Sequence, residues 1–489
     1  MQKILPIYYS DYGRYMNRFR AIPFYVDCLK PVERRILLTL HEVAKGPKFV
    51  KSAKVVGNCL ASYHPHGDAS CYGSLVQLVE QKYAVGKGNW GAAGLHDDTP
   101  AAYRYTETKI DSWIEDLAFT YIDYVPWVDI EFEKEPLYLP SPIPIGLIGD
   151  GITTGISFYR TVIPKYKLKD LVKRMIWLLE NKRPTVVTEQ LEQIEMSEDH
   201  FGPKILPNFK GCATAENMPN QYYNILINGV GSISAIPNGT IENKHISILG
   251  RAPNMTFSSN KDSDDKEKKR KRKYLVDDAD NKDKLDVVLR DLTQNNNIEI
   301  WVEPKKKNID LSQMANFIWK NYLIKKFNFN CIVCNNDGIV KTSGIDELLL
   351  NNYEAWKYAV LLKKIADYDK LNNRRFEYVV IQIIRNIFEE IKATSVSQII
   401  KKFNEYREKA GNKISIELES YDLEKSIWFK EDKEITEKDV SEICTKRNIK
   451  NLIETIIDTQ KVDHELITAK NSINNVDRDC LKYTRDLLN

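Results

Sequence analysis

A short polar turn, AAYRYTE at residues 101–107, places Arg104 between Tyr103 and Tyr105. A tyrosine hydroxyl is a weak nucleophile at neutral pH until nearby positive charge favours its anion. A buried pair of aromatic rings would explain the two tyrosines but not the arginine between them. The turn therefore provides a candidate nucleophile together with a cation that could activate it.

Three other motifs near the N-terminus supply further positive charge and hydrogen-bond donors: RAIPFYVDCLKPVERR at 20–35, YHPHGD at 63–68 and GKGNWG at 86–91. Taken singly, the histidine motif could be a simple turn or half of a metal site, and the glycine-rich motif a tight turn. Together they surround one phenol with groups suited to phosphoryl transfer from DNA, because such transfer needs cations at the phosphate oxygens. The candidate residues are Arg20, Lys30, Arg34, Arg35, His64, His66 and Arg104.

The charge is unevenly distributed along a chain whose net charge is only +3. Residues 1–110 carry 15 lysines and arginines against 9 acidic residues, whereas residues 111–160 carry 2 against 9. A basic segment followed by an acidic one is expected where one surface meets a polyanion and the next does not. No apolar run approaches the length of a membrane helix, and the eight scattered cysteines suggest reduced thiols, so we expect a cytoplasmic protein without a membrane segment. The CxxC of Cys331 and Cys334 is interpreted as strand packing, because one such pair is poor evidence for zinc.

Three regions differ in their sequence patterns, and they predict an α+β multidomain protein. Residues 1–163 hold several short helical patterns separated by Gly and Pro, which is typical of a helix-turn-helix type of DNA-binding domain. Residues 164–345 are mixed α/β and include a charge-rich insert at 258–286, interpreted as a solvated loop that could alternatively touch DNA. Residues 346–489 are helical.

Two apolar seams in the third region predict a long helix running out, a small globular tip and a long helix coming back. Each seam is a surface for packing one helix on another, although a plain structural spacer would have the same pattern. The first seam is Phe376, Val380, Ile383, Ile387 and Ile391; the second is Leu466, Ala469, Ile473, Val476, Cys480, Tyr483 and Leu487.

The motifs at 20–35, 63–68, 86–91 and 101–107, in this order and at similar spacing, resemble the breakage-reunion subunit of type IIA DNA topoisomerases, the gyrase A and topoisomerase IV A family. The stretch LPSPIPIGLIGDGITTG at 139–155 resembles the family segment that ends in a wedge isoleucine, here Ile152. The resemblance implies a winged-helix DNA-gate domain at 1–163 and a tower domain at 164–345. It also implies an antiparallel coiled-coil arm with a small globular C-gate at 346–489.

By this resemblance Tyr105 attacks a backbone phosphate and forms a transient 5′-phosphotyrosyl double-strand break, with Arg104 stabilising the transition state. Tyr103 occupies a place that the family usually gives to an apolar residue. Ile152 would insert between base pairs and bend the DNA. The remaining candidates, Arg20, Lys30, Arg34, Arg35, His64 and His66, would bind and orient DNA phosphates.

The resemblance also implies cofactors and partners. Double-stranded DNA would be the substrate, and the chain would form a homodimer through the C-gate and the DNA gate. A gyrase B-like subunit would complete a heterotetramer, bind ATP and hold Mg²⁺ mainly on its own carboxylates. We expect a compact viral or phage-like form without a C-terminal wrapping domain, associated with nucleoid or viral DNA, that relaxes and decatenates DNA rather than supercoiling it.

Some positions depart from the family pattern. Glu33 precedes the paired arginines where the family has histidine or glutamine, and three extra residues lie near ISFYRTVIP at 156–164. In bacterial relatives a serine and an acidic residue after the histidine motif anchor the Mg²⁺ that holds fluoroquinolones. Ala69 and Gly73 stand there instead, so we expect these drugs to trap the protein poorly.

Two other classes of protein remain open at this point. One is a catalytically inactive DNA-binding paralogue, against which the intact pair of Arg104 and Tyr105 argues. The other is a tyrosine recombinase or type IB enzyme, which links tyrosine to the 3′ phosphate of DNA.

Overall fold

A computed structural model describes the protein at residues 5–130, 133–181, 197–258, 274–279, 281, 284–294, 297–306, 309–446, 451–452 and 457–488. The chain divides into two compact units. Unit 1 comprises Met1–Trp356 and Leu481–Asn489, and unit 2 comprises Lys357–Cys480. The division falls inside one long helix, α12 (Ile345–Ile391).

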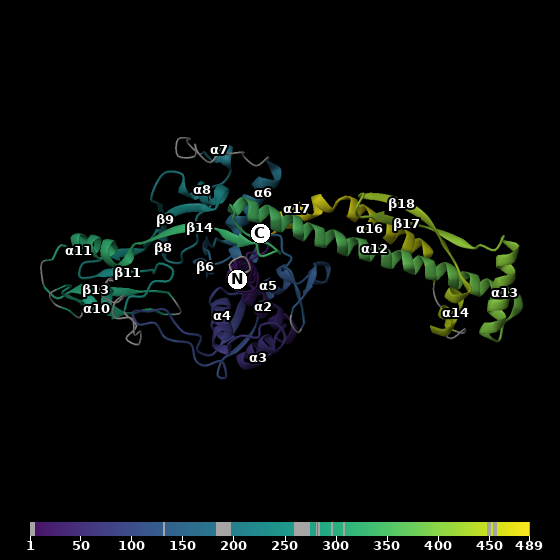
Figure 1. Ribbon diagram of the computed structural model, residues 1–489, viewed down its shortest axis with the longest axis horizontal. Helices are drawn as coiled ribbons and strands as arrows, with labels where there is room; N and C mark the ends of the chain where they lie inside the picture. The colour runs from purple at the N-terminus through teal and green to yellow at the C-terminus, as the bar shows by residue number, and fades with distance from the viewer. Residues whose placement is uncertain are drawn as a thin grey trace. The chain divides into compact units, whose positions relative to one another are not determined.

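The N-terminal part of unit 1 is a group of short helices with a small sheet (Figure 1). The apolar periodicity predicted these helices, and the prediction is confirmed. Helix α2 begins with Pro31, which suits the first helical position, and the Glu33 carboxylate accepts the backbone N–H of Lys30 at 2.8 Å. The elements are α2 (Pro31–Val43), α3 (Ser52–Ser62), α4 (Asp68–Glu80) and α5 (Ser112–Ala118), with β1 (Val50–Lys51), β2 (Ala84–Lys87) and β3 (Glu107–Ile110) in the order β1-β3-β2.

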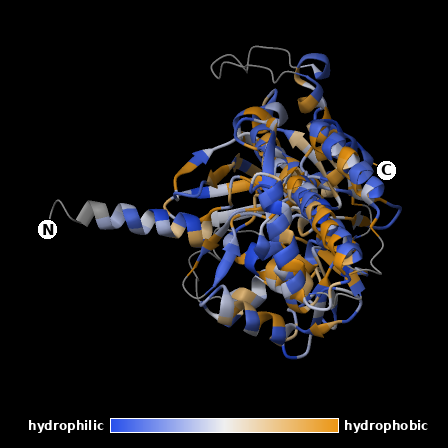
Figure 2. Cartoon of the chain, turned by 90° about the vertical axis from the view of Figure 1, so that its right-hand side faces the viewer, coloured by the Kyte–Doolittle hydropathy of each residue, from blue (hydrophilic) through white to orange (hydrophobic). Residues whose placement is uncertain are grey.

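Helix α1 (Leu5–Met16) precedes this group and extends away from the body of unit 1 (Figure 2). It continues into a π-helical turn, η1 (Asn17–Ala21), in which Asn17 and Ala21 are buried. The turn thereby fixes the end of α1 to the unit.

A five-stranded antiparallel sheet forms the middle of unit 1, in the order β6-β7-β14-β9-β8. The alternating apolar pattern at 222–237 is typical of a strand, but its first half is helix α8 (Gln221–Asn228). Gly229 ends this helix at φ +74°, and strand β9 follows. The strands are β6 (Ile152–Ile156), β7 (Arg160–Pro164), β8 (Cys212–Glu216), β9 (Val230–Pro237) and β14 (Lys325–Asn330), with helices α6 (Leu168–Glu180), α7 (Glu198–Phe201) and α8 nearby.

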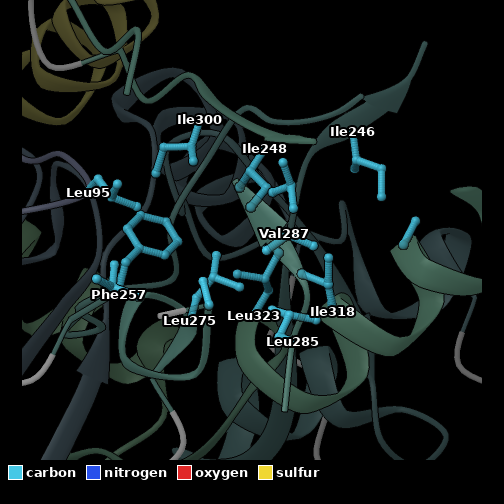
Figure 3. Close-up of a cluster of buried hydrophobic side chains, with 14 residues drawn as sticks. Leu95, Ile246, Ile248, Phe257, Leu275, Leu285, Val287, Ile300, Ile318 and Leu323 are labelled. Carbon is cyan, nitrogen blue, oxygen red and sulfur yellow. The ribbon is translucent and has the colours of Figure 1, made fainter. Parts of the chain in front are cut away.

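A four-stranded sheet, in the order β10-β11-β13-β12, packs with α10 (Leu275–Ala279) and α11 (Leu311–Ile318) around an apolar core. Figure 3 shows Leu95, from the loop after the GKGNWG motif, beside Phe257 in this core. The carboxylate of Asp291 accepts the backbone N–H of Leu95 at 2.6 Å. The strands are β10 (Gly239–Ile241), β11 (Ile246–Ile248), β12 (Val287–Asp291) and β13 (Ile300–Pro304).

Smaller hairpins complete unit 1: β4 (Trp127–Asp129) with β5 (Lys134–Pro136), and β15 (Ile332–Cys334) with β16 (Val340–Thr342). Cys331 and Cys334 are 0% and 1% exposed, which confirms the predicted strand packing. Burial raises the pKa of the Cys334 thiol to about 12.

Unit 2 contains most of α12, a hairpin of β17 (Ser415–Asp422) with β18 (Ile427–Glu434), and the helices α13 (Val396–Lys409), α14 (Glu437–Lys446) and α16 (Thr459–Asn474). Helices α12 and α16 run antiparallel, because Lys364 bonds to the Ser472 carbonyl at 2.9 Å while Arg375 pairs with Asp463 at 3.0 Å. The returning segment is not one helix: it breaks at Asn475, and α17 (Val476–Asp486) follows.

The two predicted seams pack against different partners. The second seam meets an earlier part of α12, where Leu361 and Ile365 join a cluster with Leu466 and Ile473. Residues 376–391 of α12 instead pack against the tip elements, including Phe403 of α13. Length explains the difference: α12 has 47 residues and α16 has 16, hence roughly 70 Å against 24 Å of helix.

The charge-rich run 268–273 within the insert lies outside the described residues. Within the described ranges, every helix is too short or too polar to cross a membrane.

Candidate active site

The turn at 101–105 is anchored from beneath by two of the short helices. Thr106 is 0% exposed, and its hydroxyl donates to the hydroxyl of Ser52, at the start of α3, at 2.8 Å. The hydroxyl of Tyr72, on α4, lies 3.1 Å from the Thr106 hydroxyl and donates to the Ala101 carbonyl at 2.7 Å. The turn is therefore held at both ends while its tip faces solvent.

Tyr105 lies at this tip and is 64% exposed. The guanidinium carbon of Arg104 lies 4.8 Å from the centre of the Tyr105 ring, within cation–π range. The structure thus brings together the candidate nucleophile and its cation, and leaves the phenol open to a large substrate.

Tyr103 is occupied elsewhere. Its hydroxyl donates to the carboxylate of Asp68 at 3.0 Å, and its ring meets Tyr72 edge to face at 5.6 Å. The hydrogen bond to Asp68 raises the pKa of Tyr103, which disfavours the phenolate that an attack would require. Of the two tyrosines beside Arg104, the geometry favours Tyr105 as the nucleophile.

The GKGNWG motif supports the turn from the other side. Trp90 packs against Tyr72 with ring centres 5.9 Å apart, and the Asn89 carbonyl accepts the backbone N–H of Ala101 at 3.0 Å. A side chain at Gly86 would lie 2.5 Å from the Trp90 ring, so only glycine leaves room for the indole. The motif therefore supports the turn that carries the candidate nucleophile.

The two histidines of the YHPHGD motif differ in environment. His66 is exposed immediately before α4, whose first residues are also exposed and have no side-chain cap, so backbone N–H groups and the helix dipole face the same solvent. His64 is 4% exposed, and its Nδ1 lies 3.1 Å from the Arg35 guanidinium. Burial, followed by the charge of Arg35, lowers the pKa of His64 to about 4.

His64 is accordingly neutral near pH 7. An arginine can only donate, so Nδ1 accepts from Arg35 and the remaining proton sits on Nε2. The ring of His64 meets that of His66 edge to face at 4.5 Å. His64 can position His66 or donate one hydrogen bond, but it cannot supply the positive charge expected from it.

Arg34 and Arg35 are buried ion-pair residues, which corrects the expectation of direct phosphate contacts. Each is 5% exposed. Arg34 pairs with Asp27 through two bonds of 2.7 and 2.9 Å, and Arg35 pairs with Glu135 through bonds of 2.6 and 3.0 Å. Both guanidiniums bind carboxylates within unit 1, and Arg35 reaches the site through His64.

Lys30 and Arg20 differ in how accessible their charges are to a phosphate. Lys30 is half-buried, with its ammonium 3.8 Å from Glu33. The same Glu33 caps α2, which gives this departure from the family pattern a structural reason. Arg20 is exposed on η1, and its positive charge contributes to lowering the pKa of His64. It therefore lies on the same side of the unit as the histidine turn.

Ile152 begins the edge strand β6 and is half-buried. A side-chain clamp holds the preceding backbone: Gln81, directly after α4, donates to the Asp150 carbonyl at 2.9 Å and accepts its N–H at 3.0 Å. Helix α4 therefore connects the histidine turn at its N-terminus to the Ile152 segment at its C-terminus.

A metal site is not formed by the described residues: no three His, Cys, Asp or Glu side chains lie together as ligands. Sequence reasoning missed the residues that position the site: Ser52, Asp68, Tyr72, Gln81 and Thr106. Asp68 and Thr106 lie within the recognised motifs, and Ser52, Tyr72 and Gln81 lie outside them; in every case the hydrogen-bond partner is 29 or more residues distant in sequence.

The chain is similar in sequence to known proteins. The family of DNA gyrase/topoisomerase IV A subunits matches residues 20–482. Among curated relatives, the DNA topoisomerase 4 A protein of Salmonella typhimurium is 30% identical over 357 residues, covering 70% of this chain and 44% of the relative. The DNA gyrase A protein of Clostridium acetobutylicum is 38% identical over 200 residues, covering 38% of this chain and 23% of the relative.

A similar match is found to the DNA topoisomerase 4 A protein of Staphylococcus aureus, at 27% identity over 365 residues, covering 71% of this chain and 42% of the relative. The chain therefore spans less than half the length of these relatives.

Proposed function

The chain belongs to the family of DNA gyrase/topoisomerase IV A subunits, and from this premise we propose that it is the DNA-cleaving and rejoining component of a type II topoisomerase. One observation carries the proposal: the exposed Tyr105 phenol lies under the Arg104 guanidinium on a turn fixed by Thr106.

The reaction is an exchange of phosphodiesters. The Tyr105 oxygen loses its proton and bonds to a backbone phosphorus, the bond from phosphorus to the 3′ oxygen breaks, and the freed 3′ hydroxyl takes up a proton. The product is a 5′-phosphotyrosyl link on each strand. Attack by the 3′ hydroxyl reverses the step, and because a phosphodiester replaces a phosphodiester, resealing needs no nucleotide.

The roles of the cations follow from their exposure. Arg104 favours the phenolate and stabilises the charge that develops on the phosphate oxygens. Arg20 and His66 bind neighbouring phosphates, with the N-terminus of α4 adding backbone donors. Lys30 is half-buried and adds a weaker phosphate contact. Arg34 and Arg35 stabilise the fold beneath the site through their buried ion pairs, and His64 orients His66.

Ile152 acts as an apolar wedge between base pairs and bends the gate DNA. Cleavage of both strands of this bent duplex by Tyr105 opens it, and a second duplex can then pass, which relaxes supercoils and separates linked circles. For the architecture we propose a winged-helix DNA gate at 1–163, a tower at 164–345 and a coiled-coil arm with a C-gate at 346–489. The described hydrophobic cluster between α12 and α16 supports the arm.

The proposed assembly is a homodimer on double-stranded DNA, completed by a gyrase B-like subunit into a heterotetramer in the cytoplasm, on nucleoid or viral DNA. ATP binds the partner. Mg²⁺, held mainly by the partner's carboxylates, would neutralise charge at the scissile phosphate.

The test is to trap the covalent complex. The chain is mixed with a gyrase B-like subunit, Mg²⁺ and circular DNA, the reaction is stopped with detergent, and the protein-linked DNA end is identified with end-specific exonucleases. Linkage to the 5′ end supports the proposal. Linkage to the 3′ end would indicate chemistry of the tyrosine recombinase class, and DNA binding without any adduct would indicate an inactive paralogue.

A further inference from the structure

The hairpin of β6 and β7 exposes apolar side chains beyond Ile152. Ile156, Phe158 and Tyr159 are 73%, 49% and 48% exposed. Side chains alternate along a strand, so Ile152 and Ile156 lie on the same face of β6, about 13 Å apart at the usual rise per residue. The strand is at the edge of its sheet, so the sheet does not cover its outer side.

The hairpin tip is held in place rather than loose. The Ser157 hydroxyl donates to the Asn17 side chain at 2.7 Å, and a side chain at Gly155 would collide with the Ala21 carbonyl. The Phe158 ring packs edge to face on Tyr9, with ring centres 5.4 Å apart. The contacts to Asn17 and Ala21 bring the tip beside η1, which carries Arg20.

Positive charge surrounds the exposed isoleucine. Arg160 is the direct cross-strand partner of Ile156 and is exposed, and Arg20 is exposed on the adjoining turn. Among the residues that the structure describes, neither arginine forms an ion pair with a carboxylate. An exposed aliphatic side chain flanked by available arginines is the chemistry of minor-groove DNA contacts, in which an apolar side chain inserts between base steps and arginine binds beside it.

We propose that the β6–β7 tip is a second DNA contact, in which Ile156 meets the duplex about four base steps outward from Ile152 and Arg160 binds a flanking phosphate. The inference rests on the proposed function, because it takes the bound duplex to be the one that Tyr105 cleaves. DNA is favoured over a protein partner because the residue opposite Ile156 on the strand pair is charged and positive rather than apolar.

The test uses the full chain with Tyr105→Phe, so that DNA binds without being cut, and a short duplex carrying 2-aminopurine at successive steps from the centre. Fluorescence should rise at the Ile152 step and again about four steps outward. Ile156→Thr keeps the β-branched shape, and it should remove only the outer signal and weaken binding about fivefold. Arg160→Gln should lower the slope of log affinity against log salt by about one for each hairpin bound.

Two matched substitutions in unit 2 serve as controls, Ile427→Thr and Arg478→Gln. Ile427 is 50% exposed on a strand, and the side chain of Arg478 is 77% exposed. Both should behave as the parent protein. If Ile156→Thr and Arg160→Gln bind DNA as the parent does, or lose only a gyrase B-like partner, the inference is wrong. The proposed function is judged separately, by whether the chain with Tyr105 intact forms a covalent DNA complex.

Discussion

The hydroxyl of Tyr103 donates to the Asp68 carboxylate at 3.0 Å, so one of the two tyrosines beside Arg104 is tied to the start of α4. Tyr105 makes no such bond to a carboxylate in the described residues, and it is the more exposed ring. The two tyrosines are chemically identical, but the hydroxyl of Tyr103 is engaged by a carboxylate and the side chain of Tyr105 is exposed to solvent.

The first prediction follows from that bond. Tyr103→Phe removes the hydroxyl but keeps the ring contact with Tyr72, so covalent adduct formation should stay within about twofold of the unaltered protein. Quantifying detergent-trapped complexes over time tests this. Loss of the adduct in Tyr103→Phe would mean that Tyr103 takes part in the chemistry.

A second prediction separates framework from phosphate contacts. Arg34→Ala leaves the Asp27 carboxylate buried without its partner, and should cost about 3–5 kcal/mol of unfolding free energy. Arg20→Ala, at an exposed position, should change stability by less than about 0.5 kcal/mol. It should, however, weaken DNA binding and reduce the slope of log affinity against log salt by about one for each protomer bound. Chemical denaturation and salt titrations of both variants measure the contrast; equal stability of the two would refute the buried role of Arg34.

Part of this arrangement could be predicted from sequence, and part could not. The helices α2 to α4 and the candidate site turn at 101–107 follow from local periodicity and short motifs. The burial of Arg35 does not, because its carboxylate partner, Glu135, is 100 residues away. Nor could the seams reveal that residues 376–391 pack on the tip elements, since an apolar stripe does not specify its partner.

The third prediction concerns pH. The pKa of His64 is about 4 in the folded protein, below the ordinary value of about 6.5 in an unfolded chain. Between these values the unfolded state binds more protons than the folded one, so stability is full above pH 6.5 and falls as the pH drops towards 4. His64→Asn should reduce the slope of the unfolding free energy against pH, by up to the contribution of one bound proton. Urea titrations at pH 7 and pH 5 measure it.

The exposed His200 provides the control for that experiment. His200→Asn should leave the pH dependence of stability as it is in the unaltered protein. An unchanged dependence in His64→Asn would contradict the neutral, buried state assigned to His64.

A fourth prediction concerns drugs. Ala69 and Gly73 lie four residues apart on α4, both exposed on one face, and a side chain at Gly73 would meet nothing within 4 Å. Neither offers the oxygen that the family uses to anchor a fluoroquinolone's Mg²⁺. The double variant Ala69→Ser with Gly73→Asp should therefore gain sensitivity in a cleavage-complex titration. Strong and equal trapping of both proteins would refute this and would indicate that the neighbouring Ser70 anchors the Mg²⁺ instead.

The most direct measurement compares Tyr105→Phe with the unaltered chain in the same assembly, scoring covalent DNA complexes and DNA affinity side by side. The substitution removes one oxygen and leaves the cations that dominate binding. We predict that the adduct disappears while affinity changes by less than about twofold, and that the unaltered protein carries DNA on the Tyr105 peptide through a 5′ phosphate. A covalent complex persisting in Tyr105→Phe would contradict the account.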